Sequence, residues 1–176
     1  MKLFDLTKQA VESFIKEEKI ITPPDNLPDF LKRKAGVFVT IKKNNELRGC
    51  VGTYLPTKEN IAKEIIHNAI AAATRDYRFD PIQKEELPDL VFEVYILNKP
   101  ELVNDIKELN PKKFGIIVKI NPVVSQQTKI GLLLPDLKGI DTVEKQVSLV
   151  CQKARIDPIK ENIIIYKFSV EKYAQK

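Results

Sequence analysis

The sequence predicts an α+β fold in which helices pack on one side of an antiparallel sheet. Three segments carry apolar residues at the three- and four-residue spacing of an amphipathic helix, and several shorter segments have the period of two that is typical of strands. Connectors rich in proline or asparagine separate these segments. With 176 residues, 43% of them hydrophobic and 30% charged, the chain is long enough to bury a substantial core.

The N-terminal part of the chain is expected to form a helix and then a hairpin. Apolar residues recur at helical spacing through residues 3–15, which predicts a helix over about the first 17 residues. Three prolines in residues 22–28 indicate a stiff connector. From Gly36 the period changes to two, and residues 43–46 include residue types that tolerate the positive φ of a tight turn. Residues 47–53 are therefore expected to be the return strand of a hairpin.

A second helix is expected after Pro56, with Thr57 as its N-cap. His67 is predicted on its polar side, together with Lys63 and Glu64. Its apolar stripe consists of Ile61, Ala62, Ile65, Ile66, Ala69, Ile70 and Ala73. The helix is predicted to stop within residues 74–81, ahead of a strand at residues 90–97.

The C-terminal part is expected to repeat this order of elements. The predicted elements are a short helix at 104–109, a strand at 114–120, an irregular loop at 121–128, a strand at 129–134, a helix that begins with a capping box at 141–144, and a strand at 163–170. Cys151 lies on the apolar face of that last helix, which predicts a buried thiol. Because the element order of residues 37–97 recurs in residues 114–170, we hypothesise two similar halves.

Composition excludes several classes of protein. No stretch approaches the ~20 apolar residues of a membrane helix, and charge follows the first methionine too soon for a signal peptide, so a cytoplasmic protein without membrane association is expected. Two cysteines without an export signal predict free thiols. One histidine and no CxxC or HxxxH motif argue against a metal site of the common zinc type. The net charge is +5, but the tight basic cluster at residues 32–34 is interpreted as a solvated surface, which argues against nucleic acid as a partner.

The most unusual stretch is residues 47–53, where two glycines flank a cysteine. On a strand, Arg48 and Cys50 would point the same way, about 7 Å apart at ~3.3 Å per residue. A guanidinium at that range favours the thiolate, and Gly49 and Gly52 would leave backbone amides open to a ligand. In the alternative interpretation the glycines mark a bulge or a close backbone contact, and Cys50 is a small buried side chain.

A second unusual stretch follows the predicted helix at residues 75–80. Arg75 and Arg78 offer planar forks suited to a carboxylate or phosphate, and Asp76 could orient one of them. The alternative is a structural corner held by an Arg–Asp pair, with Phe79 in the core. His67 is a candidate base for Cys50 or an ordinary surface side chain.

Several motifs resemble the AMMECR domain family, and the match spans nearly the whole chain. The matching segments are Leu47-Arg48-Gly49-Cys50-Val51-Gly52-Thr53, Arg75-Asp76-Tyr77-Arg78-Phe79, Glu86-Leu87-Pro88-Asp89-Leu90 and Gly131-Leu132-Leu133-Leu134-Pro135. A fifth segment, at residues 139–146, resembles the prokaryotic branch called AmmeMemoRadiSam system protein A. Val51 and Asp136 depart from the commoner Ile and Gln of the family.

The resemblance implies one AMMECR-type domain over residues 1–176, with a larger and a smaller lobe and a cleft lined by the segment around Cys50. It also implies a Memo-like protein and a radical SAM protein as partners, and it specifies neither a reaction nor a cofactor. The residues that match the family motifs include Arg48, Gly49, Gly52 and Thr53, which become candidate binding residues beside the candidate nucleophile Cys50.

Three functions are compatible with these patterns. In the first, Cys50 is the nucleophile or carrier of a modification system, and Arg75, Asp76 and Arg78 hold an anionic substrate. In the second, the protein is a non-catalytic binding module for a peptide, a nucleotide or a partner protein, because no base is evident near Cys50. In the third, supported by net charge alone, it is a nucleic-acid-associated factor.

Overall fold

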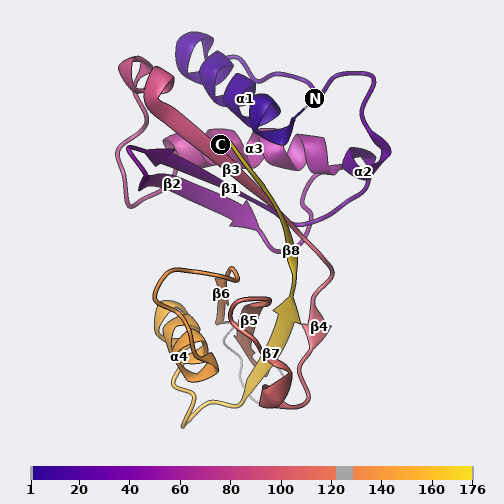
Figure 1. The fold of residues 1–176 in the computed structure, drawn as a ribbon, viewed down its shortest axis with the longest axis vertical. Coiled ribbons are helices and arrows are strands. Elements are labelled where there is room, and N and C mark those ends of the chain that lie inside the picture. The colour runs from indigo at the N-terminus through magenta and orange to yellow at the C-terminus, as the bar shows by residue number, and fades with distance from the viewer. Residues whose placement is uncertain (1, 122–128, 176) are drawn as a thin grey trace. The chain divides into compact units, whose positions relative to one another are not determined.

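The computed structural model describes residues 2–121 and 129–175, and it divides the chain into two compact units (Figure 1). The first unit comprises residues 1–97 and 171–176, and the second comprises residues 98–170. Most of the predicted irregular loop, residues 122–128, lies outside the described residues. None of the helices in the described part of the chain has both the length and the hydrophobicity needed to cross a membrane.

The first unit combines helices with a four-stranded sheet. Its elements are α1 (Leu3–Glu17), α2 (Asp29–Lys32), β1 (Val37–Lys43), β2 (Glu46–Thr53), α3 (Ile61–Thr74), the 3₁₀ helix η1 (Lys84–Asp89), β3 (Leu90–Leu97) and β8 (Val170–Ala174). The strand order in the sheet is β2-β1-β3-β8, and β1 pairs antiparallel with both β2 and β3. The predicted α+β class with antiparallel strands is therefore confirmed.

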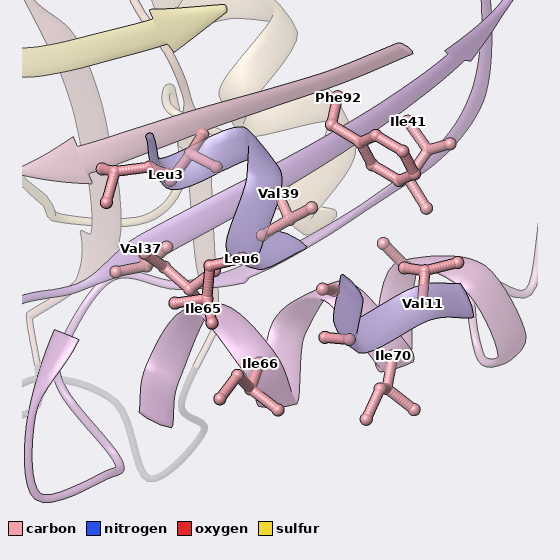
Figure 2. Packing of buried hydrophobic residues seen from close by; sticks show 14 of the residues in the cluster. Leu3, Leu6, Val11, Val37, Val39, Ile41, Ile65, Ile66, Ile70 and Phe92 are labelled. Atoms are coloured by element: carbon pink, nitrogen blue, oxygen red, sulfur yellow. The ribbon is translucent and has the colours of Figure 1, made fainter. Parts of the chain in front are cut away.

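The core of the first unit lies between the sheet and the two long helices. Figure 2 shows apolar side chains of α1 and α3 meeting those of β1 and Phe92 of β3 in one cluster. Every residue of the predicted apolar stripe of α3 is buried, and the same holds for the residues of β1 that face the helices, namely Val37, Val39 and Ile41. One face of the sheet is thus covered by helices, and Phe38, Thr40 and Lys42 lie on the opposite face.

Three details of this unit differ from the sequence-based expectation. The N-cap of α3 is Asn60, whose side chain accepts a hydrogen bond from Lys63 N, so the predicted cap at Thr57 is wrong. Both residue types cap helices well, and spacing does not distinguish them. Glu64, expected on the polar side of α3, is fully buried. The short helix α2 was not predicted, because four residues are too few to show periodicity.

The hairpin of β1 and β2 carries a bulge that decides the geometry of the site. Asn44 and Asn45 both have positive φ, 53° and 64°, as a two-residue turn of this hairpin type requires. Ile41 pairs with Gly49, but the next residue of β1, Lys42, pairs with Leu47. Arg48 is therefore the extra residue of a β-bulge, and the strict alternation expected for residues 47–53 is broken at that point.

The second unit has the same kind of architecture. Its elements are β4 (Glu101–Leu102), the 3₁₀ helix η2 (Ile106–Glu108), β5 (Gly115–Ile120), β6 (Ile130–Leu133), α4 (Val143–Ala154) and β7 (Ile163–Phe168). The strand order is β4-β7-β5-β6, with antiparallel pairs throughout. Cys151 is buried in the core as predicted. The cap of α4 is Thr142, one residue later than the predicted Asp141, which instead pairs with Lys112.

The strand orders agree with the hypothesis of two similar halves. The order β2-β1-β3 with α3 after β2 corresponds to β6-β5-β7 with α4 after β6. The fourth strands are exchanged: β4 follows β3 in the chain but pairs with β7, whereas β8 follows β7 and belongs to the sheet of β3. The single strand predicted at residues 163–170 is consequently split into β7 and β8, at Ser169.

Candidate functional site

Cys50 lies on β2 on the sheet face opposite α1 and α3. The bulge at Arg48 sets it directly across from Thr40 of β1, and Thr40 in turn pairs with Glu93 of β3. The Thr40 hydroxyl donates a hydrogen bond to Cys50 Sγ at 3.3 Å. The cysteine is half-buried, so its thiol is neither sealed in the core nor fully solvated. Cys50 with Thr40, Asp76 and Arg78 is called the Cys50 site below.

Asp76 fixes the backbone of the cysteine. Its side chain is only 4% exposed, and Oδ2 accepts a hydrogen bond from the Cys50 N–H at 2.8 Å. The Arg78 guanidinium and the backbone N–H groups of Cys50 and Arg78 lower the pKa of Asp76 to about 2, and burial only partly opposes them. The carboxylate is therefore ionised at neutral pH and serves as a rigid anchor between α3 and β2.

Arg78 is the cation of the Cys50 site. Its Nε and Nη2 donate to the two oxygens of Asp76 at 2.9 and 2.7 Å, which is the bidentate geometry of a strong Arg–carboxylate pair. Nη2 also donates to the Cys50 carbonyl oxygen at 3.3 Å. Asp76 raises the pKa of Arg78 most. Cys50 raises it further, so the Arg78 guanidinium and the Cys50 side chain interact electrostatically. Arg78 remains 43% exposed and can be reached from solvent.

Arg48, expected to activate the cysteine, has a different partner. Its Nη2 and Nε donate to the two oxygens of Glu86 at 2.8 and 3.0 Å, and its Nη1 donates to the Asp80 carbonyl oxygen at 2.9 Å. The Arg48 guanidinium, together with the Gln83 N–H and Lys43, lowers the pKa of Glu86 to about 2, although burial acts against them. The guanidinium that contacts the Cys50 backbone is thus that of Arg78, whereas the Arg48 guanidinium is bound to Glu86 and Asp80.

Phe79 joins the two arginine forks. Its ring is 5.9 Å from the Arg48 guanidinium carbon and 5.4 Å from that of Arg78, within the range of cation–π contacts. The ring is half-buried and is not part of either hydrophobic core cluster of the described residues. The corner at residues 75–80 is therefore held by an Arg–Asp pair, as the structural alternative predicted, but the prediction of Phe79 in the core is wrong, because its ring packs on the two arginines.

The two glycines beside Cys50 have packing roles. A Cβ at Gly49 would overlap the backbone carbonyl oxygen of Ala72 in α3, so only glycine allows the helix to lie this close to β2. A Cβ at Gly52 would overlap the ring of Phe38, which lies over it. The amide between them, that of Cys50, is already bonded to Asp76. The bulge and close-contact interpretation of this stretch fits these observations.

Thr53, the last residue of β2, belongs to a separate network. Its hydroxyl donates to Oε1 of the buried Glu64 at 2.7 Å. The same carboxylate accepts from the Thr57 N–H and hydroxyl and from the Lys58 N–H, all at 2.7–2.8 Å. These donors lower the pKa of Glu64 although burial, the largest single effect, acts against them. Glu64 thereby ties the end of β2 and the loop before α3 to the helix.

Arg75 lies in a third place, a groove along α3. The groove has a volume of about 670 Å³ and is lined on one side by Ile66 and Ile70 of α3 and on the other by Phe14 and the chain at residues 20–23. Arg75 and His67 line the same groove, so the histidine is not positioned as a base for Cys50. The candidate residues of the sequence thus separate into the Cys50 site, the Glu64 network and this α3 groove.

Sequence reasoning missed Thr40 and Glu86. Thr40 could be found only with the bulge, because a regular hairpin with the same turn would pair it with Gly49. Glu86 does stand out in the sequence as the acidic residue of a motif with Leu87 and Pro88. Its partner could not be predicted, because 38 positions separate it from Arg48. No periodicity connects residues at that distance.

The fold and this site define a class of protein: a two-unit α+β protein in which the strand that carries Cys50 is hydrogen-bonded to the corner at residues 75–80. The sequence profile of the family AMMECR1 matches residues 4–173. A Thermotoga maritima protein is 48% identical over 94% of this chain and 92% of its own length, and the Thermococcus kodakarensis protein TK0174 is 35% identical over 99% and 89%. The chain belongs to the AMMECR1 family.

A solved structure shows the same fold. The crystal structure of the uncharacterized protein PH0010 from Pyrococcus horikoshii matches 97% of this chain and 88% of that chain with a TM-score of 0.86, at 33% sequence identity. The α+β fold with its antiparallel sheets is therefore shared with a protein whose structure was determined by experiment.

Proposed function

We propose that this chain is a thiol-bearing component of a modification system in which Cys50 accepts and passes on a chemical group. The observation that carries the proposal is the position of Arg78, whose guanidinium donates to the Cys50 carbonyl oxygen and is held there by the buried Asp76 carboxylate. Arg78 is solvent-accessible and interacts electrostatically with the half-buried Cys50, and a cation in that position favours the thiolate, which is the nucleophilic form of cysteine.

The residues of the Cys50 site have distinct tasks in such a transfer. Asp76 holds the Cys50 backbone and the Arg78 fork in one geometry, and the Thr40 hydroxyl donates to the sulfur. The thiol loses its proton to solvent, since His67 lies in the α3 groove. The sulfur electron pair then forms a bond to an electrophilic carbon of the donor, whose leaving group departs with its bonding electrons. In the second step a nucleophile of the acceptor attacks that carbon, and the sulfur–carbon bond breaks to return the Cys50 thiolate.

The partners proposed for this system are a Memo-like protein and a radical SAM protein. Membership of the AMMECR1 family and the resemblance of residues 139–146 to its AmmeMemoRadiSam branch support this proposal. A reconstituted mixture of the three proteins provides the test. Cys50→Ala is expected to abolish product formation, and an unchanged yield would contradict the role of Cys50.

The thiolate itself is tested by alkylation of the native protein at a series of pH values, with Cys50 and Cys151 measured separately by peptide mass spectrometry. We expect Cys50 to react with a midpoint below the ~8.5 of an ordinary thiol. Cys151 is expected to stay protected, because burial raises the pKa of its thiol. Arg78→Gln should move the midpoint for Cys50 upward.

Arg48→Gln is the matched control for that experiment. Arg48 also forms a carboxylate fork and also contacts Phe79, but its carboxylate partner is Glu86. The midpoint for Cys50 should therefore change little. Protection of Cys50 until the protein unfolds, or equal shifts from the two arginine variants, would overturn the proposal.

A non-catalytic binding module is the second candidate function. It is favoured by the saturation of both arginine forks by carboxylates, which makes the corner a rigid scaffold. In that case Cys50→Ser would leave partner binding unchanged, and replacement of Arg78 would weaken it.

A further inference from the structure

The α3 groove has an apolar wall that is unusual for its position on the surface. Ile66 and Ile70 of α3 form one side, Phe14 of α1 forms another, and Ile20 stands at the edge with 65% of its surface exposed. An exposed isoleucine beside a groove of about 670 Å³ is typical of a surface that binds an apolar group. The volume lies within the range typical of small-molecule sites.

The polar residues that line the groove carry charge of one sign only. They include Lys58, Lys63 and Arg75, and no aspartate or glutamate is among the described residues that line it. Lys63 is paired with Glu59 outside the groove. Within residues 2–121 and 129–175, no carboxylate lies within ion-pair distance of Lys58 or Arg75. This contrasts with Arg48 and Arg78, each of which has a bidentate carboxylate partner.

We infer that the α3 groove binds an amphipathic carboxylate, with an aliphatic chain along Phe14, Ile20 and Ile21 and the carboxylate facing Arg75 and Lys58. Charge complementarity selects the anion, because two unpaired cations next to an apolar wall favour a ligand with one negative end. The apolar wall selects a hydrocarbon chain over a compact anion such as phosphate, which would leave the exposed Ile20 and the half-buried Phe14 and Ile21 in water.

His67 is a built-in reporter for this site. It lines the groove and is the one histidine of the chain. Burial lowers the pKa of His67 most, Lys58 and Arg75 lower it further, and Glu64 acts in the opposite direction. A carboxylate bound between the cations and the imidazole would offset the two cations, so the pKa of His67 should rise on binding.

The test follows the His67 imidazole resonances by NMR while octanoate is added to the full chain, with octanol as the neutral probe of equal length. We expect saturable shifts with octanoate, a rise in the pKa of His67, and binding of octanol at least about fivefold weaker. The absence of a saturable shift at millimolar octanoate, or equal affinity for octanol, would overturn the inference.

Two pairs of variants localise the binding. Ile20→Asp should abolish octanoate binding, and Ile159→Asp should not, since Ile159 is 93% exposed and lies outside the groove. Arg75→Gln should weaken binding about fivefold or more, whereas the exposed Lys145→Gln, on α4, should leave it unchanged. Equal effects within either pair would contradict the proposed position.

Octanoate binding and Cys50 chemistry can fail separately. The groove variants leave Cys50, Asp76 and Arg78 intact, so the midpoint of Cys50 alkylation is expected to be the same in Ile20→Asp as in the natural protein. Loss of octanoate binding with unchanged alkylation therefore concerns the groove alone.

Discussion

The backbone N–H of Cys50 donates to Oδ2 of Asp76 over 2.8 Å, although the two residues are 26 positions apart in the chain. The hydrogen bond joins β2 to the corner that follows α3, and the same carboxylate holds the Arg78 fork. One buried anion thus fixes both the position of the cysteine and the cation beside it. Its removal should affect stability and thiol chemistry together.

Asp76→Asn is expected to lower the free energy of unfolding at pH 7 by about 2–3 kcal/mol. The amide keeps the size of the side chain but loses the charge that the Arg78 fork and the Cys50 N–H require. Urea titration of the natural and variant proteins measures the difference. Glu144→Gln, an exposed change on α4 with no ion pair among the described residues, is the control and should cost far less. Equal stabilities of the Asp76 variant and the natural protein would show that the pair contributes nothing.

The pH dependence of stability should report the ionisation of two carboxylates, those of Asp76 and Glu86. Asp76 and Glu86 have pKa values of about 2 in the folded protein, below their ordinary values of 3.8 and 4.5. A lowered pKa means that the folded state favours the ionised form, so the stabilisation is present above about pH 4.5 and is lost as the pH falls toward 2.

The destabilisation caused by Asp76→Asn should therefore shrink between about pH 4 and pH 2, where Asp76 itself becomes protonated. Urea or thermal unfolding at several pH values in this range measures it. A difference between the two proteins that stays constant down to pH 2 would contradict the lowered pKa.

Gly49→Ala is expected to destabilise the first unit by about 1–3 kcal/mol, because the added methyl group meets the backbone carbonyl of Ala72 and the helix must move. Gly139→Asn is the matched control. Gly139 has open space around it, and its φ of 78° is in the left-handed region that asparagine tolerates. Thermal unfolding distinguishes the two variants, and equal melting temperatures would show that α3 shifts at no cost.

Thr53→Val and Thr53→Ser distinguish a structural role of Thr53 from ligand binding. Valine removes the hydroxyl that donates to the buried Glu64 and should cost about 1–3 kcal/mol, whereas serine keeps the donor and should cost less. Stability measured without any ligand provides the readout. If both variants are as stable as the natural protein, the structural role of the Thr53 hydroxyl is contradicted.

The local elements and their buried faces were predictable from the sequence. The apolar stripe of α3, the turn at Asn44 and Asn45, and the burial of Cys151 were expected and are confirmed. Such features depend on neighbouring residues, whose spacing records which face is buried. The family motifs also directed attention to Cys50 and to the corner at residues 75–80, which the structure brings together through Asp76.

Only the tertiary structure decided which charged groups meet. One extra residue in β2, at Arg48, pairs Cys50 with Thr40, and contacts across 28 and 38 positions assign Arg78 to Cys50 and Arg48 to Glu86. Arg75, three residues before Arg78, lines the α3 groove instead. A sequence fixes periodicity through local sterics, but the partner of a long charged side chain depends on register and on chain segments that only folding brings close.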